Sequence, residues 1–254
     1  TDESGQTRFY DNETDNYQQD HYQLHWNEKL STNWNTNLAF HYTKGKGYYE
    51  NYKEDGEVAN YGLSLISGTT INSSAISTTD LIRQKWLDND FYGTTFSANY
   101  QSNKLDFIFG GSYNKYEGDH FGKVIWARFA SQSEQGDRYY VDTATKTEAT
   151  AFAKANYQVD EKWSLFGDLQ IRNVHYQANA YETGLVNDTF SFFNPKAGLN
   201  YTVNSKNNLY FSYARANREP NRTDYESGNI KPEKLNDFEL GWRYLSDKMQ
   251  LNTN

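Results

Sequence analysis

Charged residues at even spacing are the first candidates for chemistry in this 254-residue chain. Asp237, Glu239 and Arg243 share one parity, and Asp168 and Arg172 do so on a second segment. In an extended strand, residues of one parity point to the same face. A glycosidase needs two carboxylates at a set separation across a cleft, and strand neighbours are too common to indicate one. We interpret these residues as candidates for a transport path or for contact with an enclosed domain; the alternative is an ion-pair ladder that keeps a water-facing wall soluble.

Metal, thiol and enzymatic chemistry have little support in the sequence. The absence of Cys removes disulfides, thiolate nucleophiles and Cys-based metal sites together. His21 and His25 share a face, but residues four apart on a strand lie roughly 13 Å apart, too far to share a metal ion. We therefore expect no enzyme, no metal site and no cofactor.

Aromatic residues and arginines gather in stretches that the pattern below predicts as long loops. Such side chains bind flat or glycan-like ligands by stacking and by forked hydrogen bonds; the alternative is packing between loops. Two of the arginines share one loop, where they could attract an anionic chelate, although such a group is common on surface loops. The candidates for ligand binding are Tyr48, Tyr49, Tyr52, Trp126, Arg128, Tyr139, Tyr140, Arg218 and Arg222.

These residues must be positioned by strands, because apolar residues recur at every second position in about ten segments. Leu105–Tyr113 and Trp163–Ile171 are clear examples. Short connections alternate strictly with long ones, and this predicts an antiparallel up-and-down meander. The long connections are expected at roughly 44–88, 115–146, 177–188 and 216–233. Within the first, TDLIRQKWLD predicts a one- to two-turn helix that begins at Thr79 or Asp80.

The apolar positions of these segments include no Asp, Glu, Lys or Arg, and charge reaches that face only at its rim, as at Arg215. In a soluble sandwich such a face would pack on a second sheet. Here, however, aromatic residues gather at both ends of the face with smaller residues between them, which is typical of a wall that faces a bilayer. The segments span about 9–12 residues, the length that a tilted strand needs to cross the hydrocarbon. One belt comprises Trp26, Trp34, Tyr100, Tyr157, Trp163, Tyr201 and Tyr244, and the other Tyr42, Tyr92, Tyr113, Phe193 and Tyr213.

Charge and hydropathy exclude other classes. The formal net charge of −8 and the lack of a basic stripe argue against a nucleic-acid partner. No apolar run reaches the about 18 residues of a transmembrane helix. The first residues do not form a signal peptide, so Thr1 is expected to be a cut end.

Several stretches resemble the β-barrel of TonB-dependent outer-membrane receptors, most closely those of Bacteroidetes-type bacteria. They are FNPKAGLNYTV, NNLYFSYARANREPNR, NIKPEKLNDFELGWRY, TDLIRQKWLDNDFYG and YEGDHFGKVIWARF. The resemblance implies a barrel of about 22 strands filled by a plug domain. It also implies import of a scarce nutrient, of the iron–siderophore, cobalamin or glycan class, with energy from the TonB complex.

Residues 1–254 are accordingly expected to be one all-β unit, an antiparallel meander that forms part of a transmembrane β-barrel in the cell outer membrane. It would hold about ten of about 22 strands, with the plug domain and the C-terminal strands outside the sequence. The implied partners are the lipid bilayer, the plug domain, the TonB complex and a small nutrient ligand, with a surface lipoprotein left open. Two alternatives remain: a passive porin-like channel and a soluble, aromatic-rich carbohydrate-binding β module.

Overall fold

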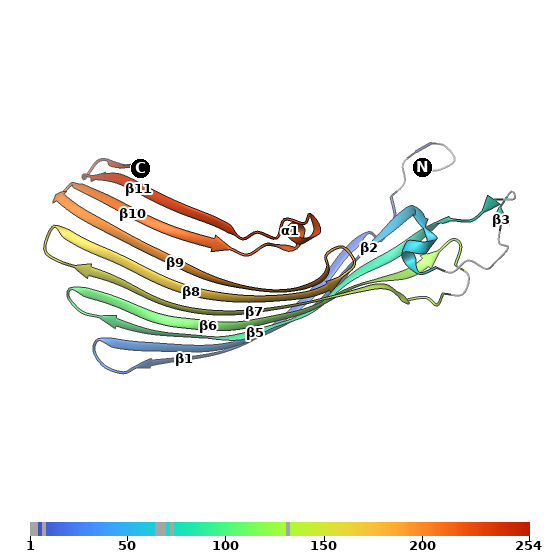
Figure 1. The fold of residues 1–254 in the computed structure, drawn as a ribbon, viewed down its shortest axis with the longest axis horizontal. Coiled ribbons are helices and arrows are strands. Elements are labelled where there is room, and N and C mark those ends of the chain that lie inside the picture. Colours follow the sequence, from blue (N-terminus) through green and yellow to red (C-terminus); the bar gives the residue numbers. More distant parts are fainter. Residues whose placement is uncertain (1–4, 7–8, 64–69, 72–73, 131–132) are drawn as a thin grey trace.

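A computed structural model describes residues 5–6, 9–63, 70–71, 74–130 and 133–254. Its main feature is a curved sheet of ten strands in the order β1-β2-β5-β6-β7-β8-β9-β10-β11-β12, each antiparallel to its neighbour (Figure 1). The predicted up-and-down meander is therefore confirmed. The strands are β1 (Thr14–Lys29), β2 (Trp34–Glu57), β5 (Thr78–Gln101), β6 (Leu105–Ala127), β7 (Arg138–Gln158), β8 (Trp163–Ala180), β9 (Gly184–Asn204), β10 (Asn207–Arg218), β11 (Glu233–Leu245) and β12 (Gln250–Thr253).

The remaining elements are short. A 3-10 helix, η1 (Val58–Tyr61), follows β2, and a small ladder pairs β3 (Thr70–Ile71) with β4 (Ser74–Ala75). The helix α1 (Arg222–Glu226) lies between β10 and β11. Among the described residues, no helix is long and apolar enough to span a membrane.

The strands extend further than the sequence pattern predicts. β2 and β5 each have 24 residues, against the about 9–12 that a bilayer requires. The predicted long connections at 44–88, 115–146, 177–188 and 216–233 are therefore too long at both ends, because they shrink to 58–77, 128–137, 181–183 and 219–232. Beyond the bilayer both faces of a strand meet water or protein, so the apolar alternation that marks a strand disappears there.

The helix predicted at TDLIRQKWLD is wrong, since these residues lie in β5. They pair with β2 on one side and with β6 on the other. Two ladders satisfy the backbone donors and acceptors, and tertiary pairing of this kind overrides local helix propensity. Leu81, a residue expected inside the helix, is fully buried in the sheet.

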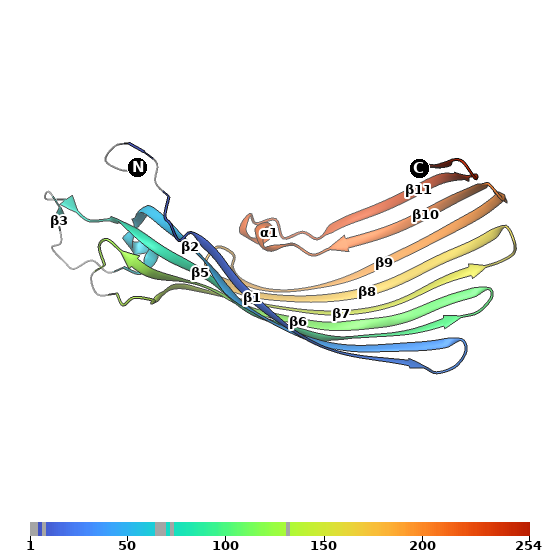
Figure 2. The ribbon, with the colours of Figure 1, turned by 180° about the vertical axis from the view of Figure 1, so that it is seen from behind.

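The outer face is the side of the sheet that carries the predicted apolar positions, and no described residue forms a second layer on it. Figure 1 and the view from behind in Figure 2 show a single curved layer of strands. Leu165 and Leu169 retain 45% and 53% exposure. A sandwich core would bury them, so the packing expected of a soluble sandwich is absent.

Aromatic pairs mark the two ends of the outer face. At the turn end, where the connections are short, Trp34 lies 5.1 Å from Tyr100 and Trp163 lies 4.4 Å from Tyr201 (ring centroids). At the opposite loop end, the Tyr42 hydroxyl donates a hydrogen bond to Asp90 over 2.6 Å. Tyrosines that combine an apolar ring with a polar contact suit the boundary between hydrocarbon and headgroups.

Two small clusters of buried residues fix the loop end. The first, here called the rim cluster, comprises Val58, Tyr61, Leu63, Leu81 and Val124. It attaches η1 to β5 and β6. A second cluster of Ala178, Val186 and Tyr225 attaches α1 to β8 and β9.

Candidate functional site

A cavity of about 540 Å³ lies on the inner face at the loop end, between η1, β5, β7 and α1. We call it the tyrosine–arginine cavity. Its polar and aromatic lining includes Tyr61, Arg83, Lys85, Tyr139, Tyr140 and Arg222, together with the carboxylates Asp142 and Glu182. Arg83 and Lys85 reach it because they alternate with the outer-face residues of β5.

Arg83 and Lys85 supply positive charge that no carboxylate neutralises in the described part of the chain. Arg83 donates one hydrogen bond to the Tyr61 hydroxyl over 2.9 Å and another to Asn51 Oδ1 over 3.1 Å. The Lys85 ammonium lies 6.0 Å from the ring centre of Tyr49, its cross-strand partner. Cations held by neutral partners keep their charge available for an anionic ligand.

Three tyrosines form an aromatic wall beside these cations. The rings of Tyr61 and Tyr139 lie 4.9 Å apart, and those of Tyr139 and Tyr140 lie 5.0 Å apart, both edge to face. A Cβ at Gly122 would overlap the Tyr139 ring, so glycine at this position makes room for the wall. Burial raises the pKa of Tyr139 and raises that of Tyr140 to about 12. Both phenols are therefore neutral at pH 7 and can donate hydrogen bonds.

Arg222 closes the cavity on the α1 side, but its charge is already used. Its guanidinium contacts Glu226 at 2.7 Å, Asp142 at 3.4 Å and Glu182 at 3.5 Å. Its role in this arrangement is to hold α1 against the wall.

Of the nine predicted ligand-binding residues, Tyr139, Tyr140 and Arg222 line this cavity, and Tyr49 lies beside it. The others are distributed elsewhere. The Tyr48 ring lies 4.5 Å from that of Trp86 in a tilted arrangement, and Tyr52 lies against Asp80. Arg128 pairs with Asp80 at 2.7 Å, and Arg218 pairs with Glu233 at 2.6 Å.

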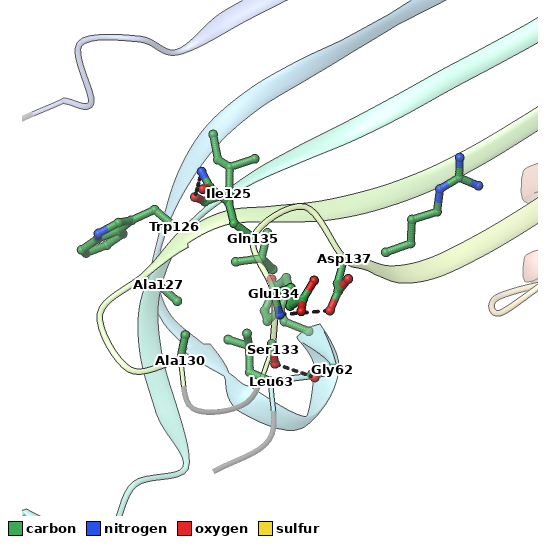
Figure 3. A pocket seen from close by; sticks show the side chains of 13 residues that line it. Gly62, Leu63, Ile125, Trp126, Ala127, Ala130, Ser133, Glu134, Gln135 and Asp137 are labelled. Carbon is green, nitrogen blue, oxygen red and sulfur yellow. Dashed lines mark hydrogen bonds between the residues drawn. The ribbon is translucent and has the colours of Figure 1, made fainter. Parts of the chain in front are cut away.

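Trp126 belongs to a second hollow of about 460 Å³ (Figure 3). Leu63, Ala127 and Ala130 give it an apolar wall, while Glu134 and Asp137 lie on the turn opposite. The Glu134 backbone N–H donates to Asp137 over 3.1 Å. In this lining the carboxylates Glu134 and Asp137 outnumber the one cation, Arg138, whereas in the tyrosine–arginine cavity Arg83, Lys85 and Arg222 outnumber Asp142 and Glu182. The hollow is therefore the poorer site for an anion.

The inner-face candidates separate into paired and unpaired groups. Asp168 lies 3.8 Å from Lys196 on the neighbouring strand. Asp237 and Glu239 belong to none of the ion pairs formed by the described residues, and Arg243 lies over the ring of Tyr210 at 4.9 Å. Among the described residues, Asp168 and Lys196 thus form an ion pair between β8 and β9, and Glu233 at the start of β11 pairs with Arg218 of β10.

Arg172 is the centre of a four-residue group that we call the inner ion network, with Lys146, Glu148 and Glu219. The Arg172 guanidinium contacts Glu219 at 2.6 and 2.9 Å and Glu148 at 2.7 Å, and Lys146 also contacts Glu219. Burial alone would raise the pKa of Glu219, but hydrogen bonds from Arg172 and Lys146 outweigh it and lower the pKa to about 2. Glu219 is therefore ionised at neutral pH.

Sequence reasoning missed Tyr61, Arg83, Lys85 and Glu219. The first three lie in a stretch predicted as loop and helix. Once that stretch is taken as a strand, parity alone places Arg83 and Lys85 on the inner face. Glu219 lies 47 and 73 residues from its partners Arg172 and Lys146, and no local pattern indicates such a contact.

Comparison with known proteins defines the family. The model of the family described as "TonB dependent receptor-like, beta-barrel" matches residues 1–254. The chain belongs to this family, and its setting is therefore the outer membrane. It is part of a receptor and not of an enzyme.

Solved structures agree on the fold. The chain is 16% identical to the ferric-catecholate import receptor Fiu of E. coli K12, with a TM-score of 0.60 over 91% of this chain and 38% of Fiu. The chain is also 16% identical to the copper transporter OprC, with a TM-score of 0.66 over 92% of this chain and 38% of OprC. It is 15% identical to the siderophore receptor PiuA of Acinetobacter baumannii, with a TM-score of 0.60 over 91% of this chain and 38% of PiuA. No curated protein sequence matches the chain.

The chain thus spans about 38% of the length of these three proteins. Its ten-stranded sheet is one part of a transmembrane β-barrel, and the uncovered outer face is the part that meets lipid. This setting overturns the soluble carbohydrate-binding alternative.

Proposed function

We propose that this chain forms part of the wall of an outer-membrane receptor that captures an anionic nutrient and imports it with energy from the TonB complex. The observation that carries the proposal is the pair Arg83 and Lys85, two cations without a carboxylate partner among the described residues, beside the wall of Tyr61, Tyr139 and Tyr140. The receptor names Fiu and PiuA support a siderophore class of ligand.

The chemistry of the cavity discriminates between the three nutrient classes. Neutral glycans would leave both cations without a counter-charge, and cobalamin offers them little negative charge. An anionic metal chelate supplies acidic oxygens for the cations and flat faces for the tyrosine rings. We therefore favour a ferric siderophore or a similar anionic chelate, and the metal is cargo.

The route from the cavity follows the inner face of the sheet. A ligand released from the tyrosine–arginine cavity would next meet the inner ion network. In the intact receptor we expect the plug domain to close this route and TonB to open it from the periplasmic side. Binding and release along the wall require no covalent step from this chain.

The test is uptake by cells that depend on the intact receptor, with a panel of radiolabelled ferric siderophores, cobalamin and labelled glycans. Replacing Arg83 or Lys85 with Ala should raise the half-saturation concentration for an anionic chelate about tenfold each, since a charged hydrogen bond contributes about 1.5–3 kcal/mol. Lys123→Ala is the matched control, because Lys123 lies over Trp86 on the outer face.

Two outcomes would reject the proposal. Equal uptake of anionic chelates by Lys123→Ala and Arg83→Ala cells would remove the cavity from the mechanism. Uptake that continues without TonB, with a steady ion current in planar bilayers, would favour the porin-like channel instead.

A further inference from the structure

The segment 219–232, between β10 and β11, folds onto the inner face of the sheet. Figure 1 shows α1 beside the middle of the sheet, well short of the loop ends of β2 and β5. Glu219 joins the inner ion network, and the Tyr225 hydroxyl donates to Asp188 over 2.9 Å. The Tyr225 ring also lies 5.4 Å from that of Tyr176. This segment is thus attached to β7, β8 and β9 at points far apart in the sequence.

The sequence explains where β10 leaves the sheet. The ladder between β9 and β10 ends at the pair Lys196 and Ala214, directly beside Pro195. Proline has no backbone N–H and cannot extend a ladder in the ordinary way. β10 has 12 residues against 21 in β9, and the chain that follows crosses the inner face.

A cavity of about 500 Å³ lies beside Glu219 on the turn side, and we call it the lower cavity. Its lining includes Arg172, Lys196, Arg215, Asn194 and Asn217. Arg215 has no carboxylate partner among the described residues, and its Nε atom is buried without a hydrogen-bond partner there. In the described part of the chain, the ion pair of Lys196 is the long contact with Asp168 at 3.8 Å.

Glu219 holds the position that an anionic ligand of this cavity would take. Its two carboxylate oxygens face the two terminal nitrogens of Arg172 in the forked arrangement by which arginine binds carboxylates and phosphates. If Glu219 withdraws, Lys146, Arg172, Lys196 and Arg215 face only Glu148 and Asp168. The remaining excess of positive charge suits an anion with more than one negative charge.

We propose that Lys146 and Arg172 form an anion-exchange site that holds Glu219 in the arrangement described here and that exchanges it for the acidic oxygens of the nutrient. Exchange removes the attachment of segment 219–232 through Glu219 and leaves those through Tyr225 and Arg222, so it favours release of the segment from the inner face. A ligand shifts such an equilibrium only if it binds the open form better. The difference comes from Lys196 and Arg215, which line the lower cavity but make no ion pair with Glu219. The inference rests on the proposed function in taking the nutrient to be anionic.

The position of the segment can be measured without transport. The chain has no cysteine, so nitroxide labels at Asn229→Cys and Gln177→Cys are unique within it. The distance between the labels is measured by pulsed electron resonance on the intact receptor in lipid nanodiscs. The probe is inorganic pyrophosphate, compared with sodium chloride at the same ionic strength because salt alone also screens ion pairs.

We expect one short distance in the otherwise unchanged receptor, and a several-fold larger population at long distance with pyrophosphate but not with chloride. Glu219→Gln should raise the long-distance population about tenfold without any probe, because a buried charged pair loses one partner. Lys146→Gln removes a cation that contacts Glu219 and should also raise the long-distance population. Glu233→Gln is the matched control, since Glu233 forms its ion pair among the described residues with exposed Arg218.

The proposal is overturned if Glu219→Gln and Lys146→Gln keep the short distance, or if pyrophosphate acts no more strongly than chloride. These results are independent of uptake. If the uptake test fails but the label distance depends on pyrophosphate, the proposed nutrient is rejected and the exchange site is kept. If the uptake test succeeds but the label distance does not respond to pyrophosphate, the exchange site is rejected and the proposed nutrient is kept.

Discussion

Arginine in place of Phe107 should strongly reduce the amount of receptor that assembles in the outer membrane. Phe107 lies on the outer face in the membrane-spanning part of β6, opposite Tyr100 of the turn-end belt and Ala155 on its two neighbours. A charge on the lipid-facing side costs about 2–4 kcal/mol at the bilayer midplane and less toward the interface. Leu169→Arg should behave in the same way. The measurement is the yield of folded, heat-modifiable receptor in the outer-membrane fraction.

The matched controls are Asp106→Asn and Asp168→Asn, which change the adjacent inner-face residues. Both should assemble nearly normally, because their side chains meet water or protein and not lipid. Normal yields for Phe107→Arg and Leu169→Arg together with poor yields for the two Asn variants would show that the faces are assigned the wrong way round.

Leu81→Ala should detach η1 from the sheet while the receptor still enters the membrane. Leu81 is fully buried in the rim cluster, and Gly56 and Tyr61 pack around it. Truncating a buried Leu to Ala costs about 2–5 kcal/mol. Tyr61 and Tyr139 would lose their support, so ligand capture should weaken as well. Hydrogen exchange should show faster exchange of the amides of Val58–Leu63.

Ile82→Ala is the control for this prediction. Ile82 is the next residue of β5, on the opposite face and only half-buried. Its truncation should leave the exchange of η1 much less affected. A result in which both variants accelerate exchange equally, or in which Leu81→Ala prevents assembly, would show that the rim cluster is not an independent support.

The membrane-spanning part of the fold could be predicted from the sequence because its two faces meet different solvents. The face of a strand that meets lipid carries no charged residue, because a charge there is costly. In β8, Leu165 and Leu169 on that face therefore alternate with Ser164 and Asp168 on the other. That contrast predicted about ten strands and their antiparallel up-and-down order. It also placed the aromatic pairs such as Trp163 and Tyr201 correctly.

The extensions beyond the bilayer could not be found by the same signal. In β5, Arg83 and Lys85 face the lumen while Gln84 and Trp86 face outward, so polar residues occupy both sides. The period-two pattern is lost there, and local propensity then favoured a helix. The candidate cavity was missed for this reason, although Tyr139, Tyr140 and Arg222 were named individually.

No local sequence pattern predicts contacts between residues on opposite sides of the lumen. Glu219 was placed in a loop, and nothing near it indicates Arg172 or Lys146 as partners. Pro195 carried a usable signal, since a residue without a backbone N–H marks a place where a neighbouring strand can leave the sheet. Sequence spacing alone does not say to which side that strand departs.

The most direct test of the account is the solvent that each face of β8 meets. Nitroxide labels at Leu169→Cys and at Asp168→Cys in the intact receptor report collision rates with oxygen, which concentrates in lipid, and with a water-soluble nickel chelate. If the outer face meets lipid, position 169 has high oxygen and low nickel accessibility, and position 168 has a lower ratio of oxygen to nickel accessibility. Equal ratios at the two positions, or a label at 169 shielded from both reagents by protein, would contradict it.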